Sequence, residues 1–336
     1  MSGGPVHAYA ALACGAALQP FEALAPPLGP YDIEIQITHC GVCHSDVHLI
    51  DDDWGLSQYP LVPGHEIVGT VQTTSPLLPF ALGERVGVGW QRGACLHCAA
   101  CIDGRDNDCP EAAPTCVGAQ GGFADRVRVD GRFAARIPEA IPSALAAPLL
   151  CAGVTVFAPL RRLNVRATTR VGVIGIGGLG HLGLQFARSF GCQVTALSSS
   201  PDKEAEARSF GAEQFICTHD PGVMRAAAGS LDLLLNATHV DLDWGAYLEL
   251  LSPGGTLCFL GTPPSEVIIP PSALFACKTV TASLIGSRST VREMLAHAAR
   301  HGVRPQVELL PMRAAQEAVE RVRANKARYR IVLETD

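Results

Sequence analysis

The stretch Val171-Gly-Val-Ile-Gly-Ile-Gly-Gly-Leu-Gly180 decides the fold of this chain. Its first residues form a short apolar run, which is typical of a buried strand, and apolar residues at helical spacing follow it at Leu182 and Phe186. The residues between fit the pattern G-x-G-x-x-G, whose fixed positions are Gly175, Gly177 and Gly180. We therefore expect a strand, a tight glycine turn and a helix in direct succession.

The segment from about 153 to 288 continues this alternation of strands and helices. Further strands are predicted at Gln193–Leu197, Gln214–Cys217, Leu231–Asn236, Thr256–Leu260 and Thr279–Ile285, with helical stretches such as Lys203–Phe210 between most of them. Strands that alternate with helices predict a parallel sheet covered on both faces. Residues 153–288 are thus predicted to form a doubly wound α/β domain.

In that fold the glycine turn is a dinucleotide-binding site, because the free N–H groups of the helix N-terminus face the pyrophosphate. An ordinary tight turn between strand and helix is the alternative. The residues of the turn that we expect to contact the dinucleotide are Gly175, Gly177, Gly178, Leu179 and Gly180.

The end of the second strand indicates which dinucleotide is bound. An NAD site would place an acid there for the ribose diol, whereas this chain has Leu197-Ser-Ser-Ser-Pro-Asp-Lys203. Hydroxyl groups and an ammonium suit a 2′-phosphate, which a carboxylate would repel. Although a serine-rich loop can be a simple turn, we predict NADP(H) rather than NAD(H), bound through Ser198, Ser199 and Lys203.

Residues 1–152 read as an irregular, mostly β domain that is rich in proline and glycine. Tyr31–Thr38 has period-two patterning, with Ile33, Ile35 and Ile37 on one face. After residue 288 the remaining segment, 289–336, carries predicted helices at Val291–His301 and Ala314–Ala324 and a last strand at Arg330–Leu333.

Composition excludes several classes of protein. The net charge of −6 gives no general attraction to nucleic acid or anionic lipid. No apolar run is expected to reach the length of a membrane span, and the first residues do not look like a secretion signal. Thirteen cysteines without such a signal argue against a disulfide framework, so we expect a cytoplasmic protein whose clustered thiols bind metal.

One cysteine cluster is local. Its four thiols follow the spacing C-x2-C-x2-C-x7-C at Cys95, Cys98, Cys101 and Cys109. Four soft ligands without an open position are the mark of structural zinc. A zinc ribbon that binds nucleic acid is the alternative for this segment, but its acids Asp103, Asp106, Asp108 and Glu111 oppose that reading.

A second set of possible metal ligands is dispersed along the chain. It comprises Cys43 in Gly41-Val-Cys-His-Ser-Asp46, the sequence Gly64-His-Glu66, and Cys151 in Leu149-Leu-Cys-Ala-Gly153. Two thiolates and one imidazole would leave a zinc ion a fourth position for substrate or for a weakly held carboxylate. Spacing alone does not show that these residues meet.

Taken together, these motifs resemble those of the zinc-containing medium-chain dehydrogenase/reductase superfamily, in its cinnamyl alcohol dehydrogenase-type branch. The resemblance covers nearly the whole chain, from Gly41–His48 and Tyr59–Gly69 through the four-cysteine loop to Tyr329–Leu333. It implies a GroES-like catalytic domain (1–152), a Rossmann cofactor domain (153–288) and a C-terminal segment that returns to the catalytic domain (289–336).

The resemblance also implies roles for single residues. Cys43, His65 and Cys151 would bind the catalytic zinc, and Glu66 would be its exchangeable fourth ligand. Asp46 would orient His65, while Ser45 and His48 would pass protons between substrate and solvent. Residues expected to touch the nicotinamide end are Thr155, Gly261, Ile285, Gly286 and Ser287. Relatives often have a threonine where this chain has Ala237, and the region around Trp54 differs from that of the lignin-pathway members.

The activity implied is hydride transfer between NADP(H) and a primary alcohol or aldehyde, in an enzyme with two zinc ions per chain that forms a homodimer. Two alternatives stay open at this point. One is an NADPH-dependent reductase of polarised C=C bonds built on the same scaffold. The other is a non-catalytic module that binds NADP or zinc.

Overall fold

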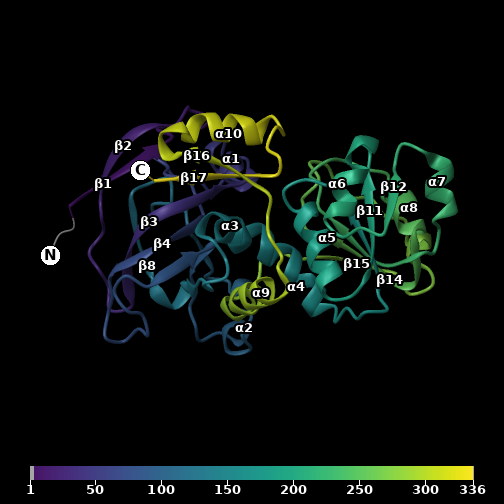
Figure 1. Cartoon of the computed structure of the whole chain (residues 1–336), viewed down its shortest axis with the longest axis horizontal. Helices are drawn as coiled ribbons and strands as arrows, with labels where there is room; N and C mark the ends of the chain where they lie inside the picture. The colour runs from purple at the N-terminus through teal and green to yellow at the C-terminus, as the bar shows by residue number, and fades with distance from the viewer. Residues whose placement is uncertain (1–3, 336) are drawn as a thin grey trace. The chain divides into compact units, whose positions relative to one another are not determined.

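The computed structural model of the chain describes residues 4–335 and contains two compact units (Figure 1). A β-rich unit comprises the chain up to Val154 together with Gly286–Arg300 and the residues from Pro305 onward. An α/β unit comprises Thr155–Ile285 and His301–Arg304. The chain thus leaves the β-rich unit for one long stretch, returns at Gly286, and contributes the short segment His301–Arg304 to the α/β unit before it continues in the β-rich unit.

The α/β unit is built on one parallel sheet with the order β12-β11-β10-β13-β14-β15. Its strands are β10 (Arg170–Ile174), β11 (Gln193–Ser198), β12 (Gln214–Cys217), β13 (Leu231–Asn236), β14 (Leu251–Phe259) and β15 (Thr279–Ala282). The strand order reverses between β10 and β13, which is the crevice where doubly wound sheets bind their ligands. The glycine turn follows β10 at this point.

Helices connect the strands of this sheet. They are α4 (Val154–Arg162), α5 (Gly180–Ser189), α6 (Glu204–Ser209), α7 (Pro221–Ala226) and α8 (Trp244–Glu249), with the short turns η4 (Pro201–Lys203) and η5 (Pro271–Leu274). α5 packs on β10 and β11, and its Leu182 and Phe186 are fully buried, as their helical spacing predicts. The predicted parallel α/β fold is confirmed.

The β-rich unit contains a mixed sheet with the order β16-β17-β3-β4-β5-β9, in which β8 also pairs with β3. Two small sheets, β1-β2 and β6-β7, flank it. Its strands are β1 (Pro5–Ala10), β2 (Gln19–Leu24), β3 (Asp32–Val42), β4 (Glu66–Thr73), β5 (Arg85–Val88), β6 (Gln91–Gly93), β7 (Ala113–Pro114), β8 (Arg126–Asp130), β9 (Ala135–Arg136), β16 (Val307–Pro311) and β17 (Arg330–Glu334).

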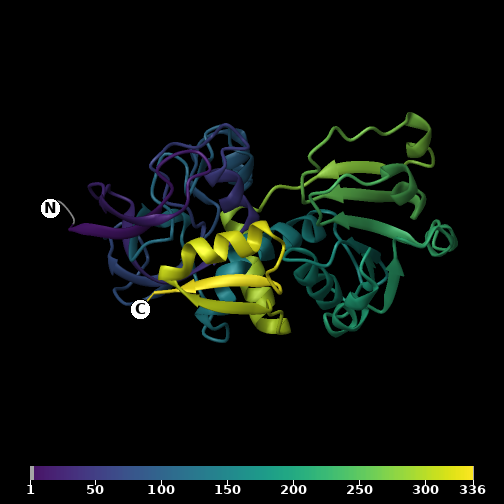
Figure 2. The same ribbon diagram turned by 90° about the horizontal axis from the view of Figure 1, so that it is seen from above.

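Short helices complete the β-rich unit. They are α1 (His44–Ile50), α2 (Ala99–Ile102), α3 (Ser143–Pro148), α9 (Arg288–His301) and α10 (Ala315–Arg323), with the turns η1 (Asp106–Asp108), η2 (Gly131–Phe133), η3 (Leu149–Gly153) and η6 (Met312–Ala314). α10 packs along β16 and β17, as Figures 1 and 2 show. Ile33, Ile35 and Ile37 of β3 are all fully buried, so the alternation predicted for this strand is confirmed.

The segment Ser143–Arg162 corrects one expectation. No apolar run was expected to approach the length of a membrane span, yet α3, η3 and α4 form a helical segment of 20 residues whose most apolar window has a mean hydropathy of 1.8. Most of it, 78% of its most apolar window, is buried inside the protein. Burial accounts for its composition, because a helix surrounded by protein is apolar on all sides.

Some boundaries also differ from the predictions. β14 begins at Leu251 rather than Thr256, β15 ends at Ala282 rather than Ile285, and α9 begins at Arg288 rather than Val291. The first part of β14 was not predicted because it contains Pro253, Gly254 and Gly255, which are uncommon inside strands. Its pairing with β13 is also irregular there, since the register shifts between Leu231 and Leu233.

Candidate functional site

Three separate segments of the β-rich unit meet in one buried cluster. Cys43 lies between β3 and α1, His65 and Glu66 lie at the start of β4, and Cys151 lies in η3. Their ligand atoms all lie within 4.8 Å of one another. η3 is a single π-helical turn, a feature that often occurs at functional sites. The structure thus brings together the four side chains that sequence spacing alone could not.

Hydrogen bonds to Asp46 hold the residues of this cluster in position. Its buried carboxylate accepts hydrogen bonds from the backbone N–H groups of Cys43 and Gly64, both at 2.9 Å, and contacts His65 Nδ1 at 2.9 Å. That contact leaves the opposite ring nitrogen, Nε2, facing the cluster, where it is buried and has no hydrogen-bond partner within residues 4–335. An imidazole oriented in this way is ready to bind a metal ion.

The Glu66 carboxylate is fully buried and pairs with the guanidinium of Arg330 on β17. Burial raises the pKa of Glu66 to about 7, although Arg330 opposes that shift. One oxygen, Oε2, has no hydrogen-bond partner among the described residues. Glu66 therefore offers an unused oxygen at the cluster, whereas its other oxygen is held by Arg330.

The two thiols of the cluster differ in acidity. A hydrogen bond with Cys151 holds the pKa of Cys43 well below its usual range, despite burial. The same hydrogen bond, together with burial, raises the pKa of Cys151. One thiolate thus forms readily in this buried pair. Two sulfurs, an imidazole nitrogen and a carboxylate oxygen make a donor set that fits zinc.

The proton-relay candidates Ser45 and His48 both lie on α1, three residues apart and therefore on one face of that helix. Ser45 Oγ lies 3.8 Å from Cys43 Sγ, next to the cluster. His48 Nδ1 lies 2.6 Å from Asp53 Oδ2. The sequence analysis missed Asp53, although the acidic run after His48 was a signal for such a partner.

A row of aromatic rings leads away from the cluster. The ring of Trp90 packs edge-on against His65 at 5.0 Å between centroids, and Trp54 packs edge-on against Trp90 at 5.9 Å. The row continues from Trp54 to His48, whose ring centroid lies 5.0 Å from that of Trp54. Sequence reasoning did not identify Trp90, because its role depends on where β5 ends relative to β4.

The four-thiolate loop forms a second cluster, in which the sulfur atoms of Cys95, Cys98, Cys101 and Cys109 lie within 4.8 Å of one another. Backbone N–H groups of His97 and Cys98 donate to Cys95 Sγ at 3.5 and 3.2 Å, which lowers the pKa of that thiol to about 6. Its closed four-sulfur donor set fits structural zinc, as its spacing predicted.

The glycine turn after β10 has the form that a dinucleotide needs. Gly175 has φ +84° and Gly180 lies so close to it that a Cβ at Gly180 would stand 1.9 Å from the Gly175 oxygen. A Cβ at Gly177 would meet nothing within 4 Å. Gly175 and Gly180 are therefore required by packing, whereas Gly177 leaves open space beside the N-terminus of α5. Gly178 and Leu179 complete the turn.

The serine loop lies next to this turn. Ser198 is buried at the end of β11, Ser199 is exposed, and the Lys203 Nζ donates to the carbonyl oxygen of Ile176 at 2.9 Å. The structure thus brings the positive charge of Lys203 between the glycine turn, where the pyrophosphate binds in such folds, and the end of β11, where the ribose binds.

The residues predicted to contact the nicotinamide end of the cofactor lie after the end of a strand or at the boundaries of the α/β unit. Gly261 follows β14, and a Cβ there would stand 2.0 Å from the oxygen of Thr238. Thr155 and Ile285 are the first and last residues of the long α/β segment, and Gly286 and Ser287 begin the return to the β-rich unit. Thr238, one residue beyond Ala237, supplies a hydroxyl at the end of β13, hydrogen-bonded to Asn236.

This architecture defines a class of protein. A doubly wound sheet with a glycine turn and a β-rich unit with a two-thiolate, one-imidazole cluster are the two halves of a metal-dependent, dinucleotide-linked oxidoreductase.

Comparison with known proteins agrees. Residues 29–139 match the alcohol dehydrogenase GroES-like domain family, and residues 178–300 match the zinc-binding dehydrogenase family. An aldehyde reductase of Synechocystis is 42% identical over 331 residues, which cover 98% of both chains. An NADP-dependent alcohol dehydrogenase C of Mycobacterium bovis is 39% identical over 339 residues, with 98% of both chains covered.

Solved structures give the same result. A cinnamyl alcohol dehydrogenase of Sorghum bicolor superposes with a TM-score of 0.94 at 36% identity, covering 98% of both chains. The cinnamyl alcohol dehydrogenase of Helicobacter pylori, complexed with NADP(H), gives a TM-score of 0.91 at 28% identity, covering 99% of both chains. The chain belongs to the zinc-dependent alcohol dehydrogenase family and is an oxidoreductase.

Proposed function

We propose that this enzyme transfers hydride between NADP(H) and a primary alcohol or aldehyde at the cluster of Cys43, His65 and Cys151, with Glu66 as a fourth, exchangeable ligand. The observation that carries the proposal is the convergence of these four side chains within 4.8 Å. Zinc bound there would act as a Lewis acid, which polarises a carbonyl and lowers the pKa of an alcohol.

Chain residues divide the remaining work. Asp46 fixes the ring of His65, and Arg330 holds one oxygen of Glu66 while the other has no hydrogen-bond partner among the described residues. Ser45, beside Cys43, donates a proton to the oxygen of the aldehyde during reduction and accepts it back during oxidation. His48 exchanges that proton with solvent, and Asp53 keeps its Nδ1 occupied so that Nε2 is the exchanging atom.

The α/β unit supplies the cofactor site. The N-terminus of α5 and the glycine turn would receive the pyrophosphate, and Ser198, Ser199 and Lys203 would select the 2′-phosphate. Thr155, Gly261, Ile285, Gly286 and Ser287 would line the nicotinamide end. The relatives described as NADP-dependent and as aldehyde reductase support aldehyde reduction with NADPH.

The aromatic row of Trp90 and Trp54 bears on the choice of substrate. Rings placed next to His65 present flat apolar surface beside the reacting atoms. We therefore expect higher kcat/KM for aromatic or unsaturated aldehydes than for small aliphatic ones of equal reactivity.

Reduction of C=C bonds is the second candidate, and product analysis separates the two reactions. With NADPH and an α,β-unsaturated aldehyde, the proposed enzyme yields the allylic alcohol, whereas a C=C reductase yields the saturated aldehyde. Saturated aldehyde as the main product would contradict the proposal, and so would cofactor binding without turnover of any aldehyde.

Lys203→Ala tests the cofactor assignment. Loss of the ammonium should raise KM for NADPH by about tenfold, since a hydrogen bond to a charged group contributes roughly 1.5–3 kcal/mol. KM for NADH should stay the same. A ratio of the two constants equal to that of the wild type would contradict the role of the serine loop.

Assembly and location form separate proposals. β15 is an edge strand of the α/β sheet and, within residues 4–335, pairs only with β14, so we propose that two copies form a homodimer through this edge. The thirteen free cysteines suit a reducing, cytoplasmic setting. A monomeric mass in solution would contradict the dimer.

A further inference from the structure

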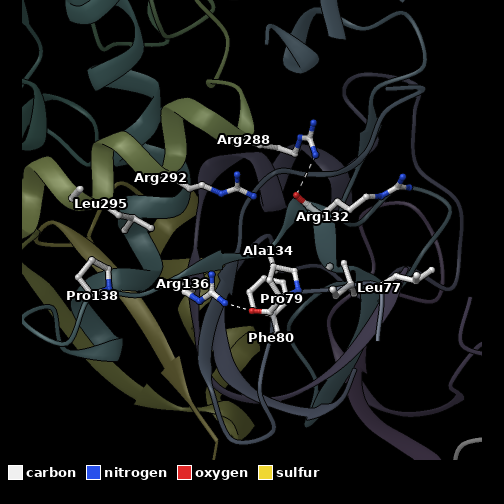
Figure 3. Close-up of a pocket in the computed structure, with 13 residues that line it drawn as sticks. Leu77, Pro79, Phe80, Arg132, Ala134, Arg136, Pro138, Arg288, Arg292 and Leu295 are labelled. Atoms are coloured by element: carbon white, nitrogen blue, oxygen red, sulfur yellow. Dashed lines mark hydrogen bonds between the residues drawn. The ribbon is translucent and has the colours of Figure 1, made fainter. Parts of the chain in front are cut away.

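A pocket of about 530 Å³ opens on the β-rich unit and shares no residue with either cysteine cluster. Four arginines line it: Arg132, Arg136, Arg288 and Arg292. Apolar side chains complete its wall, chiefly Leu77, Pro79, Phe80 and Leu295 (Figure 3). We call it the four-arginine pocket. Its volume lies within the range of sites for small organic molecules, which is roughly 300–1,000 Å³.

The positions of two of these arginines are unfavourable for the helix that carries them. Arg288 and Arg292 lie one turn apart near the N-terminus of α9, and both side chains extend from the same side of the helix (Figure 3). Like charges at this spacing repel each other, and positive charge is disfavoured at the positive end of a helix dipole. An anion held between the two groups would relieve both effects.

Carboxylates of the protein compensate this charge only in part. Asp130 pairs with Arg132 at 2.6 Å, Glu84 pairs with Arg136, and Asp106 lies 3.5 Å from Arg288. Arg292 is exposed and has no ion pair or hydrogen bond within residues 4–335. Four guanidinium groups are thus matched by three carboxylates, and the uncompensated group belongs to Arg292, a residue that lines the pocket.

Contacts with neighbouring residues hold two of the arginines, Arg288 and Arg136, in position. Asp106, which is buried in the four-thiolate loop, accepts a hydrogen bond from the backbone N–H of Arg288 at 3.2 Å. The Arg288 guanidinium also stacks over the ring of Phe133, 4.9 Å from its centroid, and Arg136 lies over the ring of Phe80 at 5.1 Å. Arginines held in this way lose little entropy when they bind an anion.

We propose that the four-arginine pocket binds an amphipathic carboxylate, a molecule with an apolar chain or ring and one carboxylate group. The carboxylate binds Arg292 and Arg288, since the guanidinium fork matches its two oxygens. The apolar part packs on Leu77, Pro79 and Leu295. A small inorganic anion would leave this apolar wall exposed to water.

Isothermal titration of the zinc- and NADPH-loaded protein with decanoate tests the proposal. Arg292→Glu should weaken binding by at least about tenfold, because it removes a charge-assisted hydrogen bond and adds repulsion. Arg300→Glu is the matched control, since it makes the same charge change on an exposed residue of α9 outside the pocket, and it should bind decanoate as the wild type does. Decanoate bound at the catalytic cluster would be affected equally by both variants.

Further titrations distinguish the contribution of charge to decanoate binding from that of apolar contact. Decylammonium should not compete with decanoate, and inorganic phosphate should compete only weakly. Leu77→Ala should weaken decanoate binding by a few fold, in proportion to the apolar surface that is lost. Equal affinity of Arg292→Glu and Arg300→Glu for decanoate would overturn the proposal. Competition by phosphate as strong as that by decanoate would overturn its apolar part.

Discussion

The two cysteine clusters of the β-rich unit are assembled in opposite ways. The four-thiolate cluster closes within one loop, from Cys95 to Cys109, whereas the other cluster joins Cys43, the pair His65–Glu66 and Cys151 from three distant segments. The first cluster can form once its own loop is folded. The second exists only when β3, β4 and the helix that contains η3 have packed together.

The two clusters also differ in how far the protein satisfies their polar atoms with hydrogen bonds. Backbone N–H groups of its own loop support the sulfur atoms of the local cluster. The dispersed cluster instead contains buried polar atoms without partners among residues 4–335, His65 Nε2 and Glu66 Oε2. Such atoms cost free energy unless a ligand satisfies them. The comparison assigns stability to the local cluster and reactivity to the dispersed one.

Cys43→Ala should have the largest effect on activity. Removal of one ligand should lower kcat/KM for aldehyde reduction by about a thousandfold, since Lewis-acid catalysis contributes several kcal/mol. Binding of NADPH, measured by fluorescence titration, should persist because the glycine turn belongs to the other unit. Cys192→Ala removes a buried thiol far from both clusters in sequence and serves as the control. Equal loss of activity and NADPH binding would refute this division.

Cys101→Ser should act mainly on stability. Loss of a structural ligand is expected to reduce the free energy of unfolding by about 3 kcal/mol or more. Thermal unfolding should shift downward by about 5–10 °C. Activity per folded, zinc-loaded molecule should fall far less than in Cys43→Ala. A variant of wild-type stability that lacks activity would be incompatible with a structural role.

Asp46→Asn sharpens the comparison within the dispersed cluster. An amide can still accept a hydrogen bond but no longer holds His65 through a charged group, so zinc affinity should fall by about 10–100-fold. Competition with a chelator, followed by the metal content of the protein, measures this loss. Only one of the two zinc ions should become labile. Simultaneous loss of both would mean that the clusters are coupled.

The smallest effect should come from a salt bridge in the α/β unit. Hydrogen bonds from Arg170 lower the pKa of Asp232 from 3.8 to about 2. The pair contributes stability above pH 4 and loses it as the pH falls toward 2. Because both side chains are about one-third exposed, Asp232→Asn should cost less than about 1 kcal/mol at pH 7. Urea unfolding across this pH range measures the difference, with Asp202→Asn as the control; a pH-independent difference would argue against the ion pair.

The sequence predicted most of the α/β unit because its signals are local. The glycine pattern sits directly between β10 and α5, and the serine loop follows β11, so each motif and its structural context are adjacent. The four-thiolate loop was predictable for the same reason. The dispersed ligands, in contrast, were expected only through family resemblance.

Other features depend on tertiary packing and escaped prediction. Pro148, Gly153 and Pro159 argue against a helix over 143–162, yet burial on nearly all sides makes this segment helical. Arg330 carries no sequence signal that links it to Glu66, because 264 residues separate them. Trp90 is similarly placed beside His65 only by the pairing of β4 with β5.

The Arg330–Glu66 pair has a consequence for how the enzyme matures. β17, which carries Arg330, inserts between β16 and β3 and so reaches the sheet only after the whole α/β unit has been synthesised. Until then the Glu66 carboxylate lacks the Arg330 guanidinium that pairs with it inside the protein. During translation, a competent reaction centre must therefore await β17, and a chain that stops before this strand would bury the Glu66 carboxylate without its guanidinium partner.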